Sequence, residues 1–541
     1  MSQSAAPSPA PPEEAVAPLT RGLSVLRALT DAEGRASAGE LSRTVGLARA
    51  TTDRITATLA CMGYVRVEEG EVLLLPAAME LGNAYLSALR LPDLLEEHAE
   101  RLADAVNLPV SLTVSDGAGA RVVQQISHHR SIGPGFRIGD LLAADHAAPV
   151  AVLAAGWEDA EWAAWRSTWG AQSGGELRER AAAARRLGWS VDAAERTSGP
   201  VSMSMPVRMP SGAVGCAVTV SGHLDRHPVD GFRDMVLPLL LASVTAMEEA
   251  LRVGSSRPSA TPGVAPGPAL AAWANAAKER WGRDFVESLA RGLGVITAFG
   301  EGREALTAGA VATATGLPRA TVRRSLITLE HLGYVTVERR AHRLTPRVLG
   351  LGFAPLSGTT LAELAQPHLT ALMTRLQDSA SMAVLAGEDI RYTARAAARR
   401  VMSVDITAGT RFPAHATSMG RILLAGLPDT ERAAWLARAS LHPLTADTVT
   451  APDDLDALLR QVRERGHALT DGELEESLRS LAVPVRGPDG QVIAAMNVAM
   501  HRGRRTLEAC LGEVLPELRA TAELLERDIK VTTRFVRLPE I

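Results

Sequence analysis

The stretch Gly316–Val335 reads GLPRATVRRSLITLEHLGYV and predicts the turn, the second helix and the first wing strand of a winged helix-turn-helix module. Gly316 supplies the tight turn, and Pro318 stands at a helix start, where a missing amide donor costs nothing. Apolar residues recur along one face of this helix, at Val322, Leu326 and Leu329. The other face carries the residues we expect to contact DNA, which are Arg319, Thr321, Arg323, Arg324 and Ser325. Such a helix fits a major groove, but taken alone it is equally typical of an amphipathic helix with a solvated basic face.

The same pattern occurs earlier in the chain, at Gly46–Val65, which reads GLARATTDRITATLACMGYV. The two copies align without a gap at an offset of 270 residues, because 316 − 46 = 270 and 333 − 63 = 270. The offset also holds upstream, where Arg21-Gly22-Leu23 corresponds to Arg291-Gly292-Leu293. A turn, a helix and a strand repeated at one offset indicate a duplicated module. The expected DNA-contacting residues of the first copy are Arg49, Thr51, Thr52 and Arg54.

The composition is that of a soluble, multidomain protein. At 541 residues, with 46% hydrophobic and 22% charged residues, the chain is too long for one hydrophobic core and has no apolar run of membrane-spanning length. Its start lacks the features of a signal peptide, and the scattered Cys61, Cys216 and Cys510 suggest neither disulfides nor a metal cluster. We therefore expect a cytoplasmic, nucleoid-associated protein without membrane contact. The net charge of −4 argues against general nucleic-acid coating but permits a local basic patch.

The periodicity predicts an α+β multidomain chain in which a winged module is followed by a larger α+β unit, and this pair is repeated. Later segments align at an offset of 278, since 484 − 206 = 278, so eight extra residues are expected around His442–Asp453 in the second copy. The predicted parts are a disordered tail (1–18), a winged helix-turn-helix (19–91), an α+β unit (92–252), a linker (253–283), a second winged module (284–356), a second α+β unit (357–531) and a tail (532–541).

Three separate motifs of the second copy, in this order, resemble the IclR family of bacterial transcriptional regulators. They are SLARGLGVITAFG at Ser288–Gly300, FPAHATSMGRILLAGLP at Phe412–Pro428 and DGELEESLRSLAVPVRGPDGQVIAAMNVA at Asp471–Ala499. They look like the subgroup that controls aromatic-acid and β-ketoadipate catabolism. Family members normally contain one such unit, whereas this chain has two in tandem.

The resemblance implies a GAF-like effector domain that binds a small organic acid, and winged modules that reach operator DNA as a dimer. It also implies a homo-oligomer or, with two copies in one chain, an intramolecular pseudo-dimer. The implied effector-binding residues are His415, Thr417, Met419, Asp471, Glu473, Ser480 and Asn497. Each has a plainer reading, since Met419 suits a core, His415 a satisfied buried imidazole, and the two acids a solvated loop.

The first copy departs from this pattern at most of the implied ligand positions. The segments in question are Leu142–Ala147, Val150-Ala151 and Ala193–Glu195, and Thr219 replaces Asn497. Only Ser202 and Glu195 keep the residue found in the second copy. We therefore expect the N-terminal effector domain to have lost or changed its ligand and to serve mainly as a dimerisation scaffold.

The two winged modules are also unequal in charge. Residues 20–90 hold 8 Arg against 8 Asp and Glu, while residues 284–355 hold 9 Arg against 6. The first wing contains Glu68, Glu69 and Glu71; the second contains Arg339, Arg340, His342 and Arg343. Because a wing follows the backbone and minor groove, where arginine is favoured and acid repelled, the second module is expected to supply most of the phosphate contacts.

Two rival classes remain open at this point. The α+β units contain histidines and acids, such as His128-His129 and Asp471-Gly-Glu473, but no nucleophile elbow, phosphate loop or HExxH motif, so an enzyme is disfavoured. A zinc ion held in an effector domain is disfavoured as well, and no catalytic residue, cofactor or metal is predicted. A DNA-binding or dimerisation scaffold without a small-molecule ligand is the alternative reading.

Overall fold

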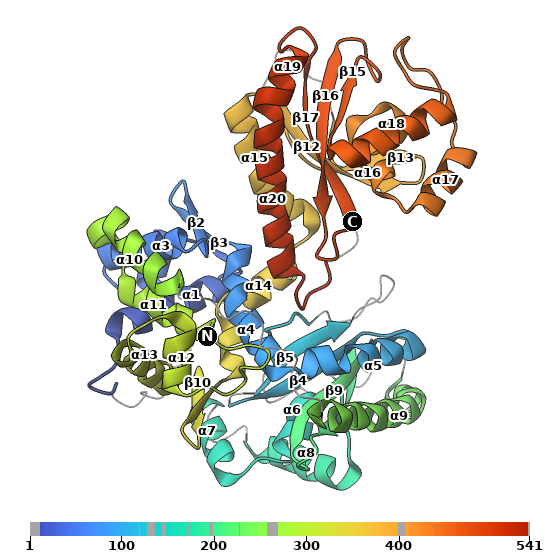
Figure 1. Ribbon diagram of the computed structural model, residues 1–541. Helices are drawn as coiled ribbons and strands as arrows, with labels where there is room; N and C mark the ends of the chain where they lie inside the picture. The colour runs from blue at the N-terminus through green and yellow to red at the C-terminus, as the bar shows by residue number, and fades with distance from the viewer. Residues whose placement is uncertain are drawn as a thin grey trace. The chain divides into compact units, whose positions relative to one another are not determined.

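The computed structural model describes residues 11–117, 119–126, 136–142, 148–169, 174–193, 199–226, 228–256, 269–398 and 406–538. The chain divides into two compact units, Met1–Gly358 and Thr359–Ile541. The first unit holds both winged modules and one α+β domain, and the second holds the other α+β domain (Figure 1).

The first winged module has the predicted turn, recognition helix and wing, and it also has a short strand, β1 (Arg35–Ser37), that was not predicted. Its other elements are α1 (Ala17–Asp31), α2 (Ala38–Val45), α3 (Arg49–Cys61), β2 (Val65–Glu68) and β3 (Glu71–Leu74). A capping box begins α2, because the Ser37 side chain accepts from the Glu40 amide and the Glu40 carboxylate accepts from the Ser37 amide. Gly46 ends α2 in the left-handed conformation, at φ 68°, and turns the chain into α3. The wing strands join β1 in a three-stranded sheet.

The second winged module repeats these elements with a smaller sheet. They are α11 (Glu287–Ile296), α12 (Ala308–Thr315), α13 (Arg319–His331), β10 (Val335–Glu338) and β11 (Ala341–Leu344). The predicted apolar stripe of α13 is confirmed, since Val322, Leu326 and Leu329 are at most 1% exposed. Gly316 is again left-handed, at φ 70°. Here the wing is a two-stranded hairpin, and Leu306 pairs with His342 in place of a third strand.

Each α+β domain is built on a six-stranded antiparallel sheet of the same order, β6-β5-β4-β9-β8-β7 in the first and β14-β13-β12-β17-β16-β15 in the second. The strands of the first are β4 (Val110–Asp116), β5 (Gly119–Ile126), β6 (Leu141–Leu142), β7 (Ser190–Ala193), β8 (Pro200–Arg208) and β9 (Val214–His223). Those of the second are β12 (Ser379–Ala386), β13 (Asp389–Ala396), β14 (Arg411–Pro413), β15 (Ala468–Asp471), β16 (Leu478–Arg486) and β17 (Val492–His501). Even the register shifts recur, at Leu112/Thr113 and Met382/Ala383, which confirms the duplication.

Helices cover both faces of each sheet. The first domain uses α5 (Leu91–Val106), α6 (Ala148–Ala154), α7 (Asp159–Trp169), α8 (Gly174–Leu187) and α9 (Val229–Ser256). The second uses α15 (Leu361–Leu376), α16 (Ser418–Gly426), α17 (Asp429–Arg438), α18 (Pro452–Arg465) and α20 (Leu515–Thr532). In Figure 1, α5 lies beside α9 and α15 beside α20, so the long helices cover one face of each sheet. No helix in the described ranges is long and apolar enough to cross a membrane.

The eight extra residues of the second copy lie where the changing offset predicted. Helices α7 and α17 start 270 residues apart (429 − 159), whereas α8 and α18 start 278 apart (452 − 174). The insertion therefore falls in the loop 439–451, between α17 and α18.

Two predicted boundaries differ from the structure. The linker predicted over 253–283 contains the end of α9 and a further helix, α10 (Ala269–Trp281), because this alanine-rich segment favours helix and Trp273 packs edge-on against Phe285 at 5.8 Å. The tail predicted over 1–18 contains the start of α1, and Glu14 and Val16 bond to the second winged module. Proline and alanine content suggested disorder there, but a partner surface within the chain orders residues 12–16.

Candidate nucleic-acid interface and candidate ligand pocket

The two winged modules pair with each other inside the first unit through matched contacts. The Val286 amide donates to the Thr58 hydroxyl at 2.9 Å, and the Val16 amide donates to the Thr328 hydroxyl at 2.9 Å. Both partners of one bond lie 270 residues from those of the other (286 − 16 and 328 − 58). Each threonine is buried in the helix that faces DNA in our prediction. The contacts thus follow a pseudo-two-fold relation between the modules.

The first helices of the modules cross at a pair of glycines. A Cβ placed on Gly22 would lie 2.2 Å from Leu289 Cδ1, and one on Gly292 would lie 2.5 Å from Leu19 Cδ2. Each leucine therefore fills the space that the facing glycine leaves open. Since 292 − 22 = 270 and 289 − 19 = 270, this contact obeys the same relation.

Two of the predicted DNA-contacting arginines hold the modules together. Arg54 Nε donates to the backbone oxygen of Arg283 at 2.9 Å, and Arg324 Nε donates to that of Glu14 at 3.3 Å. Both side chains lie at the edge of the paired surface and bond to the chain that enters the other module. Their first role in the structure is therefore positioning.

The remaining predicted contacts divide by exposure. Arg319, Arg323 and Arg49 are exposed on their helices, and Thr321 and Thr51 are half-buried. Thr52 and Ser325 are only 0% and 2% exposed, so they face the core and cannot reach a groove. At the offset of 270 they correspond to the buried Val322 and Ile55, so the equivalent apolar residue of the other copy marked the inward direction of each position.

An exposed arginine of each recognition helix forms an ion pair with an acid, but the acid comes from a different part of the chain in each module. In α3, Arg49 Nε contacts the Asp53 carboxylate at 2.8 Å within the helix. In α13 the equivalent of Asp53 is Arg323, which forms an ion pair with the carboxylate of Glu14 from the N-terminal segment.

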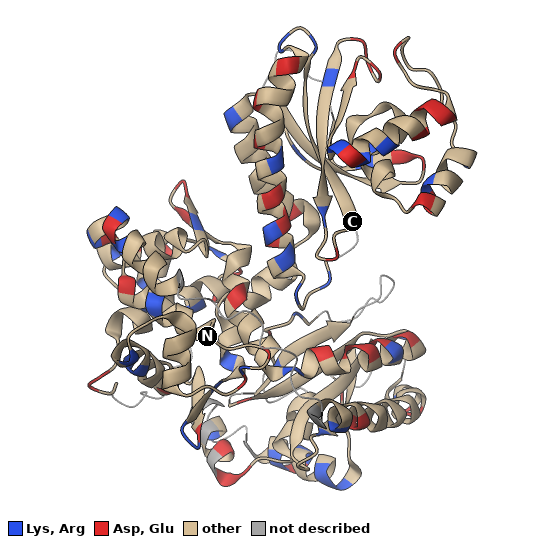
Figure 2. Ribbon diagram, viewed as in Figure 1, with Lys and Arg blue, Asp and Glu red and all other residues tan. Residues whose placement is uncertain are grey.

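The tips of the two wings share a backbone conformation but differ in charge. The first turn places Glu69 and Gly70 in the left-handed region, at φ 50° and 86°. The second places Arg339 and Arg340 there, at φ 48° and 72°. A side chain in this region costs on the order of 1 kcal/mol, which Gly70 avoids and Arg340 does not. Figure 2 shows the resulting contrast between an acidic β2–β3 tip and a basic β10–β11 tip.

A cavity of about 400 Å³ opens in the second α+β domain between the sheet and the segment that leads into α16. Four of the seven predicted ligand residues line it, namely Thr417, Met419, Ser480 and Asn497. Apolar side chains form much of the remaining wall, including Ile406, Phe412, Leu474 and Met500. This volume and mixture suit a small organic molecule.

A buried polar network forms one wall of the cavity. Ser418 Oγ and Ser480 Oγ lie 2.7 Å apart, and Asn497 Nδ2 donates to Ser480 Oγ at 2.8 Å. Asn497 is 3% exposed, and its Oδ1 has no hydrogen-bond partner among the described residues. An acceptor of this kind is costly when unpaired, so it favours a ligand that donates a hydrogen bond.

The sequence analysis missed several polar residues of the pocket, including Glu475, His501 and, on β13, Arg395 and Tyr392. Arg395 Nη1 donates to the backbone oxygen of Ile406 at 3.0 Å, which holds the guanidinium at the cavity wall. Burial raises the pKa of Tyr392 to about 12, so its phenol stays protonated and can donate. The alternation of Tyr392 with its neighbours on a strand was the only available signal, and it does not say which face meets the cavity.

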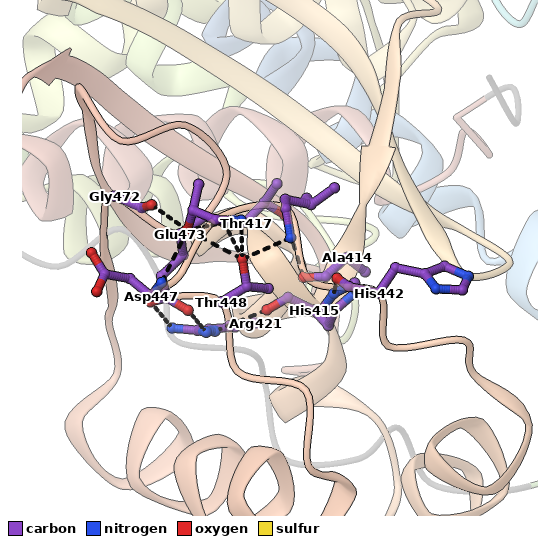
Figure 3. Close-up of polar contacts among 11 residues, drawn as sticks. Ala414, His415, Thr417, Arg421, His442, Asp447, Thr448, Gly472 and Glu473 are labelled. Carbon is purple, nitrogen blue, oxygen red and sulfur yellow. Dashed lines mark hydrogen bonds and ion pairs between the residues drawn. The ribbon is translucent and has the colours of Figure 1, made fainter.

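Three predicted ligand residues, Glu473, Asp471 and His415, instead bond to neighbours outside the pocket lining, and Figure 3 shows two of them, Glu473 and His415. Glu473 and Arg421 form a bidentate ion pair, with Nη1 2.7 Å from Oε1, although Arg421 is only 2% exposed. The Asp471 carboxylate accepts from Arg479 at 2.9 and 3.0 Å. His415 Nε2 lies 3.1 Å from the backbone oxygen of His442, and burial lowers the pKa of His415. None of the three lines the cavity, because each is already used by a neighbour within the protein.

The inserted loop 439–451 closes over this ion pair. Thr445 donates to the backbone oxygen of Gly472 at 2.7 Å, and Thr448 donates to that of Glu473 at 2.7 Å. The extra residues of the second copy therefore fix the acidic segment and, through Arg421, the start of α16.

The first α+β domain has different side chains at the matching positions. Gln125 stands where Arg395 stands, since 395 − 270 = 125, and Ala151 replaces Arg421. Thr219, in place of Asn497, bonds to Ser204 at 2.8 Å. Ser202 remains on β8, whereas Glu195, His128-His129 and the 143–147 part of the departing segment lie outside the described residues.

Comparisons with known proteins agree with this architecture. The description "IclR helix-turn-helix domain" matches residues 18–69 and 288–339, and "Bacterial transcriptional regulator IclR C-terminal" matches 83–248 and 353–527. The chain is 48% identical over 240 residues to the Pca regulon regulatory protein of Pseudomonas putida, covering 44% of this chain and 82% of that protein.

Two further relatives each match a similar share of the chain. The p-hydroxybenzoate hydroxylase transcriptional activator of Acinetobacter baylyi is 34% identical, over 45% of this chain and 91% of that protein. A solved transcriptional regulator from Rhodococcus sp. RHA1 is 47% identical, over 46% of this chain and 99% of that one, at a TM-score of 0.44. With two helix-turn-helix and two C-terminal domains matched, the chain belongs to the IclR family of bacterial transcriptional regulators.

Proposed function

We propose that the protein binds operator DNA chiefly through α13 and the β10–β11 wing. The observation that carries this is Arg340, a charged residue kept in a strained wing turn where the first copy has glycine. The proposed contacts of the second module are Arg319, Thr321, Arg323, Arg340 and Arg343, with Arg49 and Thr51 of the first module contributing less. Arg54 and Arg324 act as positioning residues at the edge of this surface.

The salt dependence of binding to the upstream DNA of its own gene tests this ranking. Each lost phosphate contact lowers the slope of log K against log salt by about 1. The double change Arg340→Ala/Arg343→Ala should flatten the slope, whereas Arg49→Ala should change it less. Equal changes from both variants would refute the ranking.

The pocket of the second α+β domain is proposed to bind a small aromatic carboxylate. Arg395 supplies a positive charge, Tyr392 a donor and Asn497 Oδ1 an acceptor, while Phe412 and Met419 offer apolar surface. A hydroxybenzoate combines a carboxylate, a ring and a hydroxyl donor that match these groups. One named relative activates p-hydroxybenzoate hydroxylase, which agrees with this class.

Calorimetric titration of the full-length protein with benzoate, 4-hydroxybenzoate and 4-hydroxybenzyl alcohol tests the pocket. The acid with both groups should bind tightest, and the alcohol should bind weakly because it lacks the carboxylate. Equal affinity for the acid and the alcohol would count against a role for Arg395.

The first α+β domain is proposed to act as a scaffold. Its segment 136–142 contacts both winged modules, since Arg137 bonds Glu33 at 2.6 Å and a Cβ on Gly139 would lie 3.1 Å from the Ala354 amide. The same titration should then give one ligand per chain, and two equal sites would contradict a scaffold.

The protein is proposed to work in the cytoplasm at the nucleoid. We also propose the domain limits predicted from the sequence, except in the two segments corrected above. The paired modules support one chain as a DNA-reading pseudo-dimer, and higher assembly of chains is left to measurement. The relatives are named as regulators, and no reaction is assigned to the chain.

A further inference from the structure

The paired modules place two different readers on one DNA-facing assembly. In a dimer of identical chains the two readers are the same, so the site that they prefer is a palindrome. Here the matched bonds of Thr58 and Thr328, and the matched leucine–glycine contacts, make the same kind of pair within a single chain. Nothing in a covalent pair requires the two half-sites to be equal.

The recognition helices carry opposite charges at an equivalent exposed position. Asp53 on α3 and Arg323 on α13 are equivalent and both exposed. An arginine favours guanine edges and phosphates, whereas an aspartate accepts from cytosine and repels phosphate. A half-site matched to one helix therefore does not match the other.

The wings add a second difference at the flank of each half-site. At equivalent positions of the two tips, Glu69 and Gly70 stand in one wing, and Arg339 and Arg340 stand in the other. A narrow, A·T-rich minor groove attracts arginine and repels carboxylate. The two flanks of the preferred site should then differ in composition.

We infer that one chain binds one non-palindromic duplex in a single orientation, with the β10–β11 wing at the A·T-rich end and the β2–β3 wing at the other end. This rests on the proposed DNA-binding function. The partner is thus a directional operator, which fixes on which side of the promoter each half of the protein lies.

Two experiments test the inference with the full-length protein. In the first, a random duplex pool is enriched by binding, and the selected site is compared with two palindromes made from its left and right halves. Each palindrome mismatches one reader at several base pairs, and a mismatch costs about 1–3 kcal/mol, so the selected site should bind roughly tenfold tighter or more. A palindrome bound equally tightly by one chain would overturn the inference.

In the second, an iron chelate is attached to a cysteine on either wing, using Glu68→Cys or Glu338→Cys. These positions are equivalent and exposed, with side chains 56% and 69% accessible. Cys61 is half-buried, so it is first changed to alanine, while Cys216 and Cys510 are buried. Each chelate should cleave one end of the selected site, and the two should cleave opposite ends.

The outcomes separate the two proposals. If no duplex is enriched, DNA binding itself fails. If duplexes are enriched but each chelate cleaves both ends equally, DNA binding stands and the single orientation is refuted. If Cys61→Ala unfolds the protein, the palindrome comparison, which needs no substitution, still decides.

Discussion

In the second α+β domain, a charged side chain from β13 meets the cavity and a buried ion pair supports the cavity wall. The first domain has Gln125 and Ala151 at the two matching positions. Its helices pack instead through three tryptophans, with Trp157, Trp162 and Trp165 in edge-on contacts at 5.1 and 6.3 Å. Trp162 stands where Arg432 of the second domain pairs with Asp429 and Asp456.

The difference teaches that strand order and register do not depend on the polar interior. Both sheets keep the same six-strand order and the same two register shifts, although Gln125, Ala151 and Trp162 stand where the second domain has arginines. Apolar alternation along the strands is enough for the fold. Asn497 Oδ1 belongs to the wall of the second domain's pocket and the Arg421–Glu473 ion pair supports that wall, so we relate them to that pocket and not to the fold.

The largest expected effect concerns the buried ion pair of the second domain. Arg421→Ala should lower the free energy of unfolding by about 3–5 kcal/mol, because it leaves the Glu473 carboxylate buried without its partner. The double change Arg421→Ala/Glu473→Ala should cost less than the single change. Chemical denaturation followed by circular dichroism measures both, and a double variant worse than the single one would contradict an ion-pair role.

The second prediction transfers one residue of the first domain to the second. Arg395→Gln should weaken the binding of an aromatic carboxylate about 10- to 100-fold, since a hydrogen bond to a charged group contributes about 1.5–3 kcal/mol. Calorimetry with 4-hydroxybenzoate measures the loss, and binding of the matching alcohol should not change. The reciprocal Gln125→Arg is the control, and it should leave the stoichiometry unaltered.

Some of these features could be predicted from the sequence alone, and others could not. The duplication, the module order and the capping box of Ser37 were predictable because they are local or repeat at a fixed offset. Thr417, Met419, Ser480 and Asn497 came from a family pattern and do line the pocket. Arg395 was missed, and Glu473 was misplaced, because neither the face of a strand nor a buried partner 52 residues away is encoded locally.

The third prediction tests the pairing of the winged modules. Thr58→Val and Thr328→Val each leave one partly buried backbone amide, of Val286 or Val16, without its acceptor. Each should destabilise the first unit by about 1–3 kcal/mol, and by similar amounts, if the contacts are equivalent. Thermal unfolding of both variants measures this. A cost confined to one of them would show that the pseudo-two-fold relation is only geometric.

The fourth prediction separates DNA binding from stability in the second wing. Arg340→Gly should raise the free energy of unfolding by about 1 kcal/mol, because glycine relieves the left-handed conformation. The same change should reduce the salt slope of DNA binding by about 1. The opposite substitution, Gly70→Arg, is the matched test in the first wing and should lower stability. A variant that gains stability and keeps its DNA affinity would remove Arg340 from the interface.

The smallest effect is expected at the N-terminal segment. Glu14 pairs with Arg323 on α13, and both side chains are largely exposed, at 45% and 63%. Glu14→Ala should leave the melting temperature unchanged, because exposed ion pairs contribute little to stability. The variant protein should bind random-sequence DNA about two- to fivefold more tightly at low salt. The reason is that Arg323 no longer pairs with a carboxylate and the DNA phosphates are no longer repelled by Glu14. The control is Glu13→Ala, which removes the same negative charge from the neighbouring position, where the side chain is also exposed. An equal gain in DNA affinity from Glu13→Ala would assign the effect to net charge. A gain restricted to Glu14→Ala would assign it to the ion pair between Glu14 and Arg323 on α13. In α3 the acid that pairs with an arginine is instead Asp53, which belongs to the helix itself.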